Sequence, residues 1–216
     1  MEFAIISEGI TDQIVIEAII QGYLGNRDII LDPLQPKKGA PGGWNRVIDY
    51  CKSKDFEQSI PYVDYIIIHI DCDVLKSEKI PADCIMPLNG LSSADIFEMV
   101  KEKIKEFISI QVFKQCKNKI VFAIAIDSIE CWFLPIYYPS KPATGNKTSG
   151  CIKTLNPALL KEEGFYIDEK RPEDYRVIAK YYRKKNTVEL CYKMNESFKL
   201  FIDSLNHALT TNITVN

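Results

Sequence analysis

Histidine is scarce in this chain, and cysteine lacks the spacing of a metal site. The 216 residues include two histidines, His69 and His207, which leaves little material for a histidine-based zinc site or a Ser-His-Asp triad. The seven cysteines occur singly, without a CxxC pair. We therefore interpret them as reduced core residues, not as a disulfide framework or a zinc site. The chemistry expected of this chain is carboxylate chemistry.

Long apolar runs are also missing. No run approaches the roughly 18 consecutive apolar residues that a membrane span needs. The first apolar segment has no basic stretch before it and ends at Glu8, so we interpret it as a buried strand and not as a signal peptide. These absences predict a cytoplasmic protein without a membrane contact. A hydrophobic content of 46% suits one large domain, or one domain with an appendage.

Neither sign of charge dominates the whole chain, but the two parts of the chain differ. Residues 1–135 carry 14 Lys and Arg against 20 Asp and Glu, a net charge of −6, whereas residues 136–216 carry 13 against 9, a net charge of +4. An acidic first part with a basic last part favours a cation-binding site joined to a segment that meets an anion. Ordinary solvated surface explains the same distribution equally well.

Strand and helix signals alternate over the first two-thirds of the chain. The predicted strands are residues 3–7, 29–34, 63–70, 85–88 and 120–126. The predicted helices between them are residues 11–24, 44–53 and 93–110. The apolar, β-branched run in the third strand is typical of a strand covered on both faces. This order predicts an α/β fold with a mostly parallel sheet flanked by helices.

The last third of the chain has a different character. A polar segment with glycine and proline, residues 140–149, indicates a loop and a boundary. We expect a catalytic domain at residues 1–138 and a basic helical extension at residues 139–216, packed on the first domain. Helices are predicted at residues 172–185 and 195–209.

Carboxylates follow three of the predicted strands. Glu8 follows the first strand, Asp71 and Asp73 follow the most apolar one, and Asp127 and Glu130 follow the last. The carboxyl ends of parallel strands lie at one edge of a sheet, where ligands bind. Acids crowded there repel one another, and a divalent cation compensates their charge. If the strand continues far enough, alternate spacing points Asp71 and Asp73 to the same side.

Some of these acids have a simpler explanation. Asp12 lies at the start of the first predicted helix, where an acid favours the helix N-terminus. Asp127 and Glu130 have the spacing of a capping box with acidic members. Asp71 and Asp73 have no such folding role, because a doubly charged turn directly after the most apolar strand does nothing for the core.

Two of these motifs together resemble the Toprim domain. ISEGITD at 6–12 places a glutamate after the first strand, and IHIDCD at 68–73 places a DxD pair after a later one. SIECWFL at 128–134 is similar to an acidic helix signature of OLD-family nucleases and related uncharacterised bacterial proteins. GGW at 42–44 and NESFKLF at 195–201 are also similar to features of those relatives. The resemblance covers residues 1–135, with an aspartate at 12 where glutamate is commoner and a cysteine at 131 where some relatives have an acid.

The resemblance implies a Rossmann-like Toprim fold and Mg²⁺-dependent hydrolysis of phosphodiester bonds, with Mn²⁺ as a substitute. One ion is expected on Glu8, Asp71 and Asp73, and a second near Asp12 and Glu130. Asp127 is a further candidate, as a ligand or as a residue that orients one. The expected metal ligands are the acids that follow the strands or begin the first helix: Glu8, Asp12, Asp71, Asp73, Asp127 and Glu130. The expected catalytic residues combine four of these acids with one base: Glu8, Asp71, Asp73, Glu130 and Lys180.

Lys180 is chosen because it opens the basic and aromatic segment KYYRKK at 180–185. Lysine and arginine between tyrosines suit contact with a nucleic-acid backbone and its bases. A solvated helix face with tyrosines turned inward explains each of these residues as well. The partners implied are DNA or RNA as substrate, an ATPase protein and a second copy of the chain, and the company that such proteins keep implies defence against phage or foreign DNA.

Three other functions fit parts of the sequence. IDCDV at 70–74 also resembles the nucleophile motif of haloacid-dehalogenase-type phosphatases, with Asp71 as the nucleophile and Asp73 as the acid/base. That motif usually opens its fold, and it leaves Glu8 unexplained. A non-catalytic Toprim partner of an ATPase is a second alternative, although a dead site need not keep its acids. Nucleotidyl or strand transfer is a third, but the chain lacks the length for the accessory domains of primases and topoisomerases.

Overall fold

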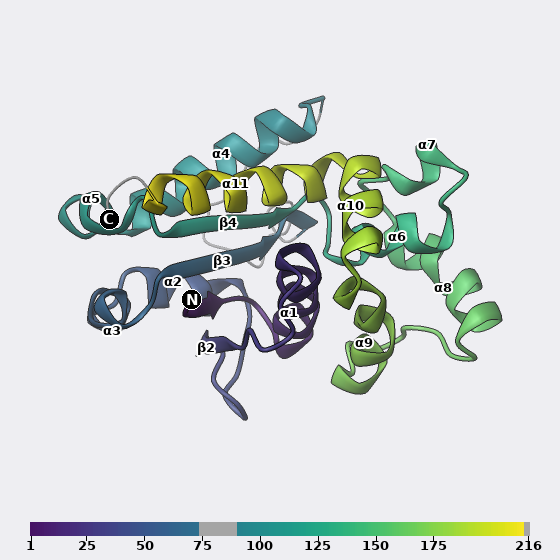
Figure 1. Cartoon of the computed structure of the whole chain (residues 1–216), viewed down its shortest axis with the longest axis horizontal. Coiled ribbons are helices and arrows are strands. Elements are labelled where there is room, and N and C mark those ends of the chain that lie inside the picture. Colours follow the sequence, from purple (N-terminus) through teal and green to yellow (C-terminus); the bar gives the residue numbers. More distant parts are fainter. Residues whose placement is uncertain (74–89, 214–216) are drawn as a thin grey trace.

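A four-stranded parallel sheet forms the centre of the molecule. The computed structural model describes residues 1–73 and 90–213. The strands are β1 (Phe3–Ile6), β2 (Leu31–Gln35), β3 (Tyr65–Asp71) and β4 (Ile120–Ala125), and they lie in the order β2-β1-β3-β4 (Figure 1). All three pairings are parallel. The predicted α/β class and parallel sheet are therefore confirmed. The strand predicted at 85–88 lies outside the described residues.

Strand β3 lies between β1 and β4, and all seven of its residues are buried. Its register pairs Ile68 with Ile6 on one side and with Phe122 on the other. β-branched residues pack well on a pleated surface covered from both sides. This sequence therefore forms a central strand, as predicted, and it carries Asp71 to the carboxyl edge of the sheet.

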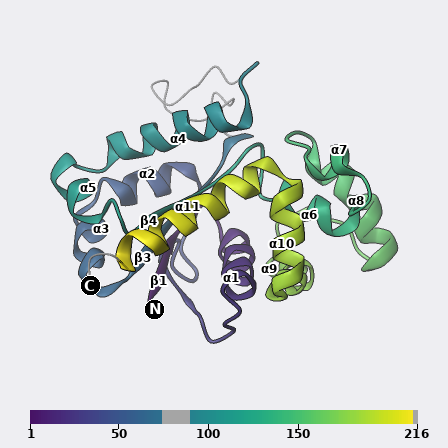
Figure 2. The same cartoon turned by 45° about the horizontal axis from the view of Figure 1, so that its top comes forward.

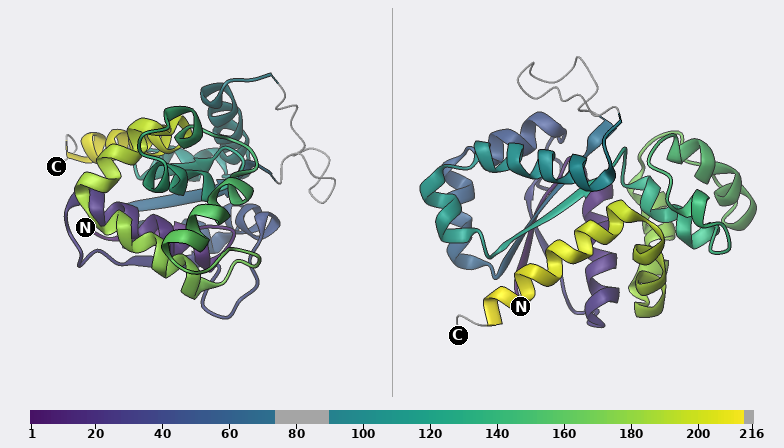
Figure 3. Two further views of the ribbon diagram at one scale, coloured as in Figure 1. Left: turned by 90° about the vertical axis from the view of Figure 1, so that its right-hand side faces the viewer. Right: turned by 90° about the horizontal axis from the view of Figure 1, so that it is seen from above.

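Helices cover both faces of the sheet, each with its own apolar core (Figures 2 and 3). On one face lie α2 (Trp44–Cys51), α3 (Lys54–Ser59), the 3-10 segment η1 (Ile60–Tyr62), α4 (Ser93–Phe107) and α5 (Ile110–Cys116). The core of the other face is built from α1 (Ile10–Leu24), α6 (Glu130–Tyr137), α8 (Cys151–Glu162), α9 (Pro172–Ala179), the 3-10 segment η4 (Lys180–Arg183), α10 (Lys185–Met194) and α11 (Glu196–Ile213). The short α7 (Pro142–Gly145) packs against α6.

The region after residue 138 shares the core of the first part of the chain. Phe198 and Phe201 of α11 stack on Trp132 of α6, with ring centroids 5.0 and 5.4 Å away. The predicted extension thus packs closely against the sheet layer. The single helix predicted at 172–185 is instead broken into α9, η4 and α10. The break accompanies the burial of Tyr182, whose carbonyl lies so close to Gly22 of α1 that a Cβ there would be 1.8 Å away.

Helix α11 lies along the edge strand β4 (Figure 1). Ser204 Oγ accepts a hydrogen bond from the Phe122 backbone N–H at 2.9 Å. Ser197 Oγ accepts one from the Ile126 N–H at 3.0 Å and donates to the Ile124 carbonyl at 3.2 Å. Unpaired backbone groups at a sheet edge invite association with other strands. Two serine hydroxyls of α11 therefore form hydrogen bonds with backbone N–H and carbonyl groups to which a fifth strand would otherwise pair.

Among residues 1–73 and 90–213, no helix combines the length and the apolar character that crossing a membrane requires.

Candidate metal centre

Glu8 and Asp71 meet at the carboxyl edge of the sheet. Glu8 follows β1, and its Oε1 accepts the Asp71 backbone N–H at 2.8 Å. The loop before α2 fixes the backbone of Glu8, because the Gly43 N–H donates to its carbonyl at 2.7 Å. A Cβ on Gly42 would lie 1.9 Å from the same carbonyl oxygen. The paired glycines of the GGW motif therefore permit a close approach of this loop to Glu8.

Asp71 is the most extensively paired acid of the cluster. It is 4% exposed. Its Oδ1 accepts the Ile129 N–H at 2.8 Å and lies 3.3 Å from His69 Nε2, while its Oδ2 accepts from Lys170 Nζ at 3.1 Å. Burial alone raises the pKa of a carboxyl group. Here the Lys170 ammonium and His69 outweigh burial and lower the pKa of Asp71 to about 2. Asp71 is therefore ionised at neutral pH.

Asp12 has both of the roles considered for it. Its Oδ2 accepts the Gly9 N–H at 2.8 Å, as a helix-capping acid does. It is also 2% exposed and faces the same cluster, since Asp12, His69 and Asp71 offer ligand atoms within 4.8 Å of one another. Burial is the main cause that raises the pKa of Asp12 to about 6 and that of Glu8 to about 8, with the Asp71 charge adding to both.

Glu130 is the first residue of α6 and is completely buried. Its Oε1 accepts a hydrogen bond from the Tyr175 hydroxyl and lies 3.2 Å from Lys170 Nζ. Its Oε2 has no hydrogen-bond partner among the described residues. A buried carboxylate oxygen without a partner costs free energy unless a cation or a donor satisfies it. The donor set at this point is hard oxygen, which Mg²⁺ and Mn²⁺ prefer.

Lys170 provides the lysine charge of the cluster, in place of the predicted Lys180. Lys180 lies on η4 and pairs with Glu163 Oε2 at 3.1 Å. Lys170 comes from the loop between α8 and α9 and bridges Asp71 and Glu130. It follows Asp71 by 99 residues, and no aromatic or basic run marks it. The basic and aromatic segment at 180–185 therefore does not supply the cation of the cluster, and its Tyr182 is completely buried.

His69 is a second residue that the sequence pattern did not single out. It is completely buried on β3, with Nδ1 2.6 Å from the Ala123 carbonyl oxygen and Nε2 beside Asp71. Burial lowers the pKa of an imidazole, but the carboxylates of Asp71, Asp12 and Glu8 raise the pKa of His69 to about 9. Its position two residues before Asp71 in a strand was the available signal, because side chains at that spacing share a face.

Asp73 and Asp127 lie at the border of the cluster. Strand β3 ends at Asp71, so alternate spacing does not continue to Asp73, which is exposed. The Asp73 N–H donates to the Asp127 carbonyl at 2.8 Å. Asp127 has a positive φ of 73°. Ile129, not Asp127, is the N-cap of α6 and no side chain caps it, so the capping-box explanation of Asp127 and Glu130 is wrong.

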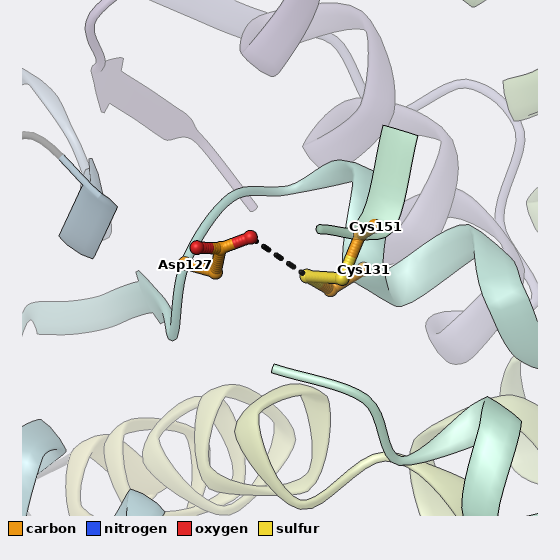
Figure 4. Close-up of side chains that lie close together, drawn as sticks. All are labelled: Asp127, Cys131 and Cys151. Carbon is orange, nitrogen blue, oxygen red and sulfur yellow. Dashed lines mark hydrogen bonds between the residues drawn. A yellow bond between two sulfur atoms is a disulfide. The ribbon is translucent and has the colours of Figure 1, made fainter. Parts of the chain in front are cut away.

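Two cysteines beside the cluster are joined, which corrects the expectation that all cysteines are reduced. Cys131 of α6 and Cys151 of α8 form a disulfide, with Cα atoms 5.0 Å apart (Figure 4). Asp127 Oδ2 points at Cys131 Sγ from 3.9 Å. The packing of α6 against α8 brings the two sulfurs together. The spacing of the cysteines in the sequence does not predict this disulfide. The described cysteines Cys51, Cys72, Cys116 and Cys191 are buried thiols, as predicted.

The resulting site has an excess of negative charge in a buried place. Glu8, Asp12, Asp71 and Glu130 converge from β1, α1, β3 and α6, against the two cationic partners Lys170 and His69. A divalent cation suits this arrangement, since it would supply the missing charge and a partner for the free oxygen of Glu130.

No protein-family model matches the chain, and neither curated proteins nor solved structures include a match to it.

Proposed function

We propose that this protein is a metal-dependent phosphodiesterase of the Toprim type, which uses Mg²⁺ or Mn²⁺ to hydrolyse DNA or RNA. The observation that carries the proposal is the convergence of four carboxylates at the edge of a parallel sheet, with the free Oε2 of Glu130 among them. The Toprim resemblance of the Glu8 and Asp71 motifs supports it. A partner ATPase, a second copy of the chain and a role in defence are implied by that resemblance alone.

Each residue of the cluster has a task in this proposal. Glu8, Asp71 and Asp12 would hold a divalent ion, with Glu130 for a second one, and Asp73 and Asp127 at the open border are further candidates. A bound ion would supply charge stabilisation at the phosphoryl oxygens and an activated water. His69 faces the carboxylate of Asp71 from within the sheet, with Nε2 3.3 Å from Oδ1, and its positive charge would keep Asp71 ionised. The Lys170 ammonium, half exposed beside Asp71, is placed to bind a phosphoryl oxygen.

The test is cleavage by purified protein with Mn²⁺ or Mg²⁺. Substrates are plasmid DNA, single-stranded DNA and RNA, with bis(p-nitrophenyl) phosphate and p-nitrophenyl phosphate as a diester and a monoester. We expect metal-dependent cleavage of diesters, and a loss of at least about 100-fold in Asp71→Asn. Asp203→Asn is the matched control, because Asp203 pairs with Lys199 on the exposed face of α11.

Three results would contradict the proposal. Hydrolysis of the monoester alone would support the phosphatase alternative with Asp71 as nucleophile. Calorimetry that detects no Mn²⁺ binding to the folded protein, or equal Mn²⁺ binding by wild type and Asp71→Asn, would refute the metal centre itself.

A further inference from the structure

Three tyrosines surround a cavity at the end of α6 that is opposite to Glu130. The cavity has a volume of about 550 Å³, within the range of pockets that hold small organic groups. Tyr137 and Tyr138 come from the end of α6, Pro157 from α8 and Tyr181 from η4. The end of α6 and η4, which are distant in the sequence, thus present aromatic rings to one space, and α8 contributes the proline.

Glu163 holds two of these rings in position. Its Oε1 accepts hydrogen bonds from the hydroxyls of Tyr137 at 3.2 Å and Tyr181 at 2.6 Å. The rings of Tyr137 and Tyr181 meet edge to face, with centroids 6.3 Å apart. The Tyr138 hydroxyl donates to the Thr154 carbonyl at 2.9 Å. Rings fixed in this way lose little entropy when a flat ligand stacks on them.

Lysines accompany the aromatic rings of this cavity. Lys180 Nζ lies 4.9 Å from the centre of the Tyr181 ring, and Lys141 Nζ lies 5.7 Å from that of Tyr138. Lys161 lines the cavity, with its side chain 80% exposed. Aromatic faces alternating with positive charge are the means by which proteins bind single-stranded nucleic acid, because rings stack on bases and cations contact phosphates.

Helix α6 connects this cavity to the candidate metal centre. Glu130 begins the helix in the carboxylate cluster, and Tyr137 ends it at the cavity. Seven residues at about 1.5 Å each give a separation of ~11 Å along the helix. This equals about three nucleotides at the ~3.4 Å rise of a stacked strand.

We propose that this cavity, lined by Tyr137, Tyr138 and Tyr181, binds an unpaired base of a single-stranded nucleic acid a few nucleotides from the phosphate at the metal centre. The inference rests on the proposed function for the identity of its ligand. It makes single strands, or the unpaired ends of duplexes, the preferred substrate class. Lys141, Lys161 and Lys180 then contact the backbone on either side of the bound base.

Binding is measured apart from cleavage, by fluorescence anisotropy of a labelled 12-nucleotide oligodeoxythymidine in EDTA. We expect Tyr138→Ala and Tyr181→Ala each to weaken binding by about 5- to 100-fold, the loss of one stacked base. Tyr138→Phe and Tyr181→Phe keep the ring and lose only its hydroxyl contact, so they should weaken binding much less than the alanine variants. Tyr166→Ala is the matched control, because Tyr166 is 52% exposed and does not line the cavity.

Circular dichroism and thermal unfolding of each variant separate a loss of the ring from a loss of the fold. Unchanged binding in both alanine variants, equal losses in Tyr166→Ala, or no binding of the oligonucleotide by wild type would overturn the inference. Binding of a proline-rich peptide in place of the oligonucleotide would overturn it as well. Ring-dependent binding without metal-dependent cleavage would refute the proposed function and leave the cavity assignment in place. Cleavage without ring-dependent binding would overturn the cavity assignment and leave the proposed function in place.

Discussion

At the scale of single residues, Lys170 decides the charge of the carboxylate cluster. Its ammonium contacts Asp71 and Glu130 at 3.1 and 3.2 Å. Both carboxylates are buried and raise the pKa of Lys170 above its usual value, against the effect of its own burial. One flexible side chain thus compensates two acids that come from different elements. A divalent ion at the same carboxylates would compete with this lysine for their oxygens.

We expect Lys170→Met to destabilise the metal-free protein by about 1.5–3 kcal/mol, because two buried charge-assisted contacts are lost. The same change should tighten Mn²⁺ binding and lower cleavage by about 100-fold, if Lys170 binds the phosphoryl group. Urea unfolding in EDTA, calorimetry and the cleavage assay measure these effects. Lys199→Met is the matched control, since it removes a lysine paired with Asp203 on the exposed face of α11. Equal cleavage losses in both variants would contradict the assignment.

The pKa values of the cluster predict how stability depends on pH. Glu8 titrates at about 8 in the folded protein against a usual 4.5, and Asp12 at about 6 against 3.8. Between these values the folded state holds protons that the unfolded state has lost, so rising pH lowers stability. His69, at about 9 against 6.5, contributes stability below pH 6.5 that is lost as pH rises through 9. The lowered pKa of Asp71 makes stability rise with pH instead, but only between about pH 2 and 3.8.

In EDTA, the free energy of unfolding should therefore fall steadily from pH 5 to pH 9. Saturating Mg²⁺ should reduce this fall, because the ion takes the place of the protons. Glu8→Gln should flatten the dependence while it keeps an acceptor for the Asp71 N–H. Glu98→Gln, at an exposed position, serves as the control. Urea titrations at pH 5, 7 and 9 test this, and a stability that rises over this interval would contradict it.

The sequence predicted six acids at one edge of the sheet, of which four converge, but it did not predict what neutralises them. Glu8 and Asp71 end strands, and parallel strands bring their ends together whatever the rest of the chain does. Glu130 joins them by following β4. Lys170 comes from a loop whose course depends on the packing of α8 and α9. No periodicity in the amino-acid sequence predicts that packing. The sequence does not predict His69 as a member of the cluster, because a histidine in an apolar strand is more often a core residue.

At the scale of elements, α11 is tied to β4 by serine hydroxyls as well as by apolar packing. Ser197 Oγ accepts the N–H of Ile126 and the indole N–H of Trp132 at 2.9 Å. The segment NESFKLF at 195–201 is similar to a feature of the uncharacterised Toprim-like proteins. In the structure this segment has a packing role, since Phe198 and Phe201 stack on Trp132.

Ser197→Ala should lower the free energy of unfolding by about 2–4 kcal/mol, because it leaves two buried donors without a partner. Ser204→Ala should cost less, about 1 kcal/mol, since it leaves only the Phe122 N–H. Urea unfolding followed by tryptophan fluorescence compares them, and Trp132 reports directly on the site. Equal effects of the two substitutions would show that Trp132 finds another acceptor.

The elements predicted with most success are those in which one local pattern determines the outcome. The apolar runs of β1, β3 and β4 form strands because both faces of the sheet are covered. Helix α4 begins at Ser93, as predicted, and Ser92 Oγ caps it by accepting the Asp95 N–H. The helix predicted at 172–185 fails because Tyr182 packs against Gly22, a contact across 160 residues that overrides local helix propensity.

At the scale of the whole molecule, the Cys131–Cys151 disulfide joins the helix that carries Glu130 to the helix that precedes Lys170. It closes a loop of 20 residues. In the chain-entropy description, a loop of this length stabilises the folded state by about 3 kcal/mol. The bond therefore joins α6, which carries Glu130, to α8, and the loop after α8 carries Lys170.

We expect a reducing agent to lower the free energy of unfolding by about 3 kcal/mol. The double substitution Cys131→Ala and Cys151→Ala should lower it similarly and abolish the further effect of the reducing agent. Thiol titration of the unfolded protein should count two more thiols after reduction. An unchanged count would contradict the bond, and sensitivity of the double variant to reduction would assign the effect to other cysteines.

The order in which the cluster residues occur along the chain has a consequence for biosynthesis. Glu8 and Asp12 leave the ribosome more than 150 residues before Lys170 and Tyr175. Until then Glu130 lacks both partners of its Oε1, and α9 cannot pack on α1. A growing chain therefore exposes its acids long before it can arrange them. If the assembled cluster cuts nucleic acid, an unfinished chain held beside messenger and ribosomal RNA does not yet have the means to do so.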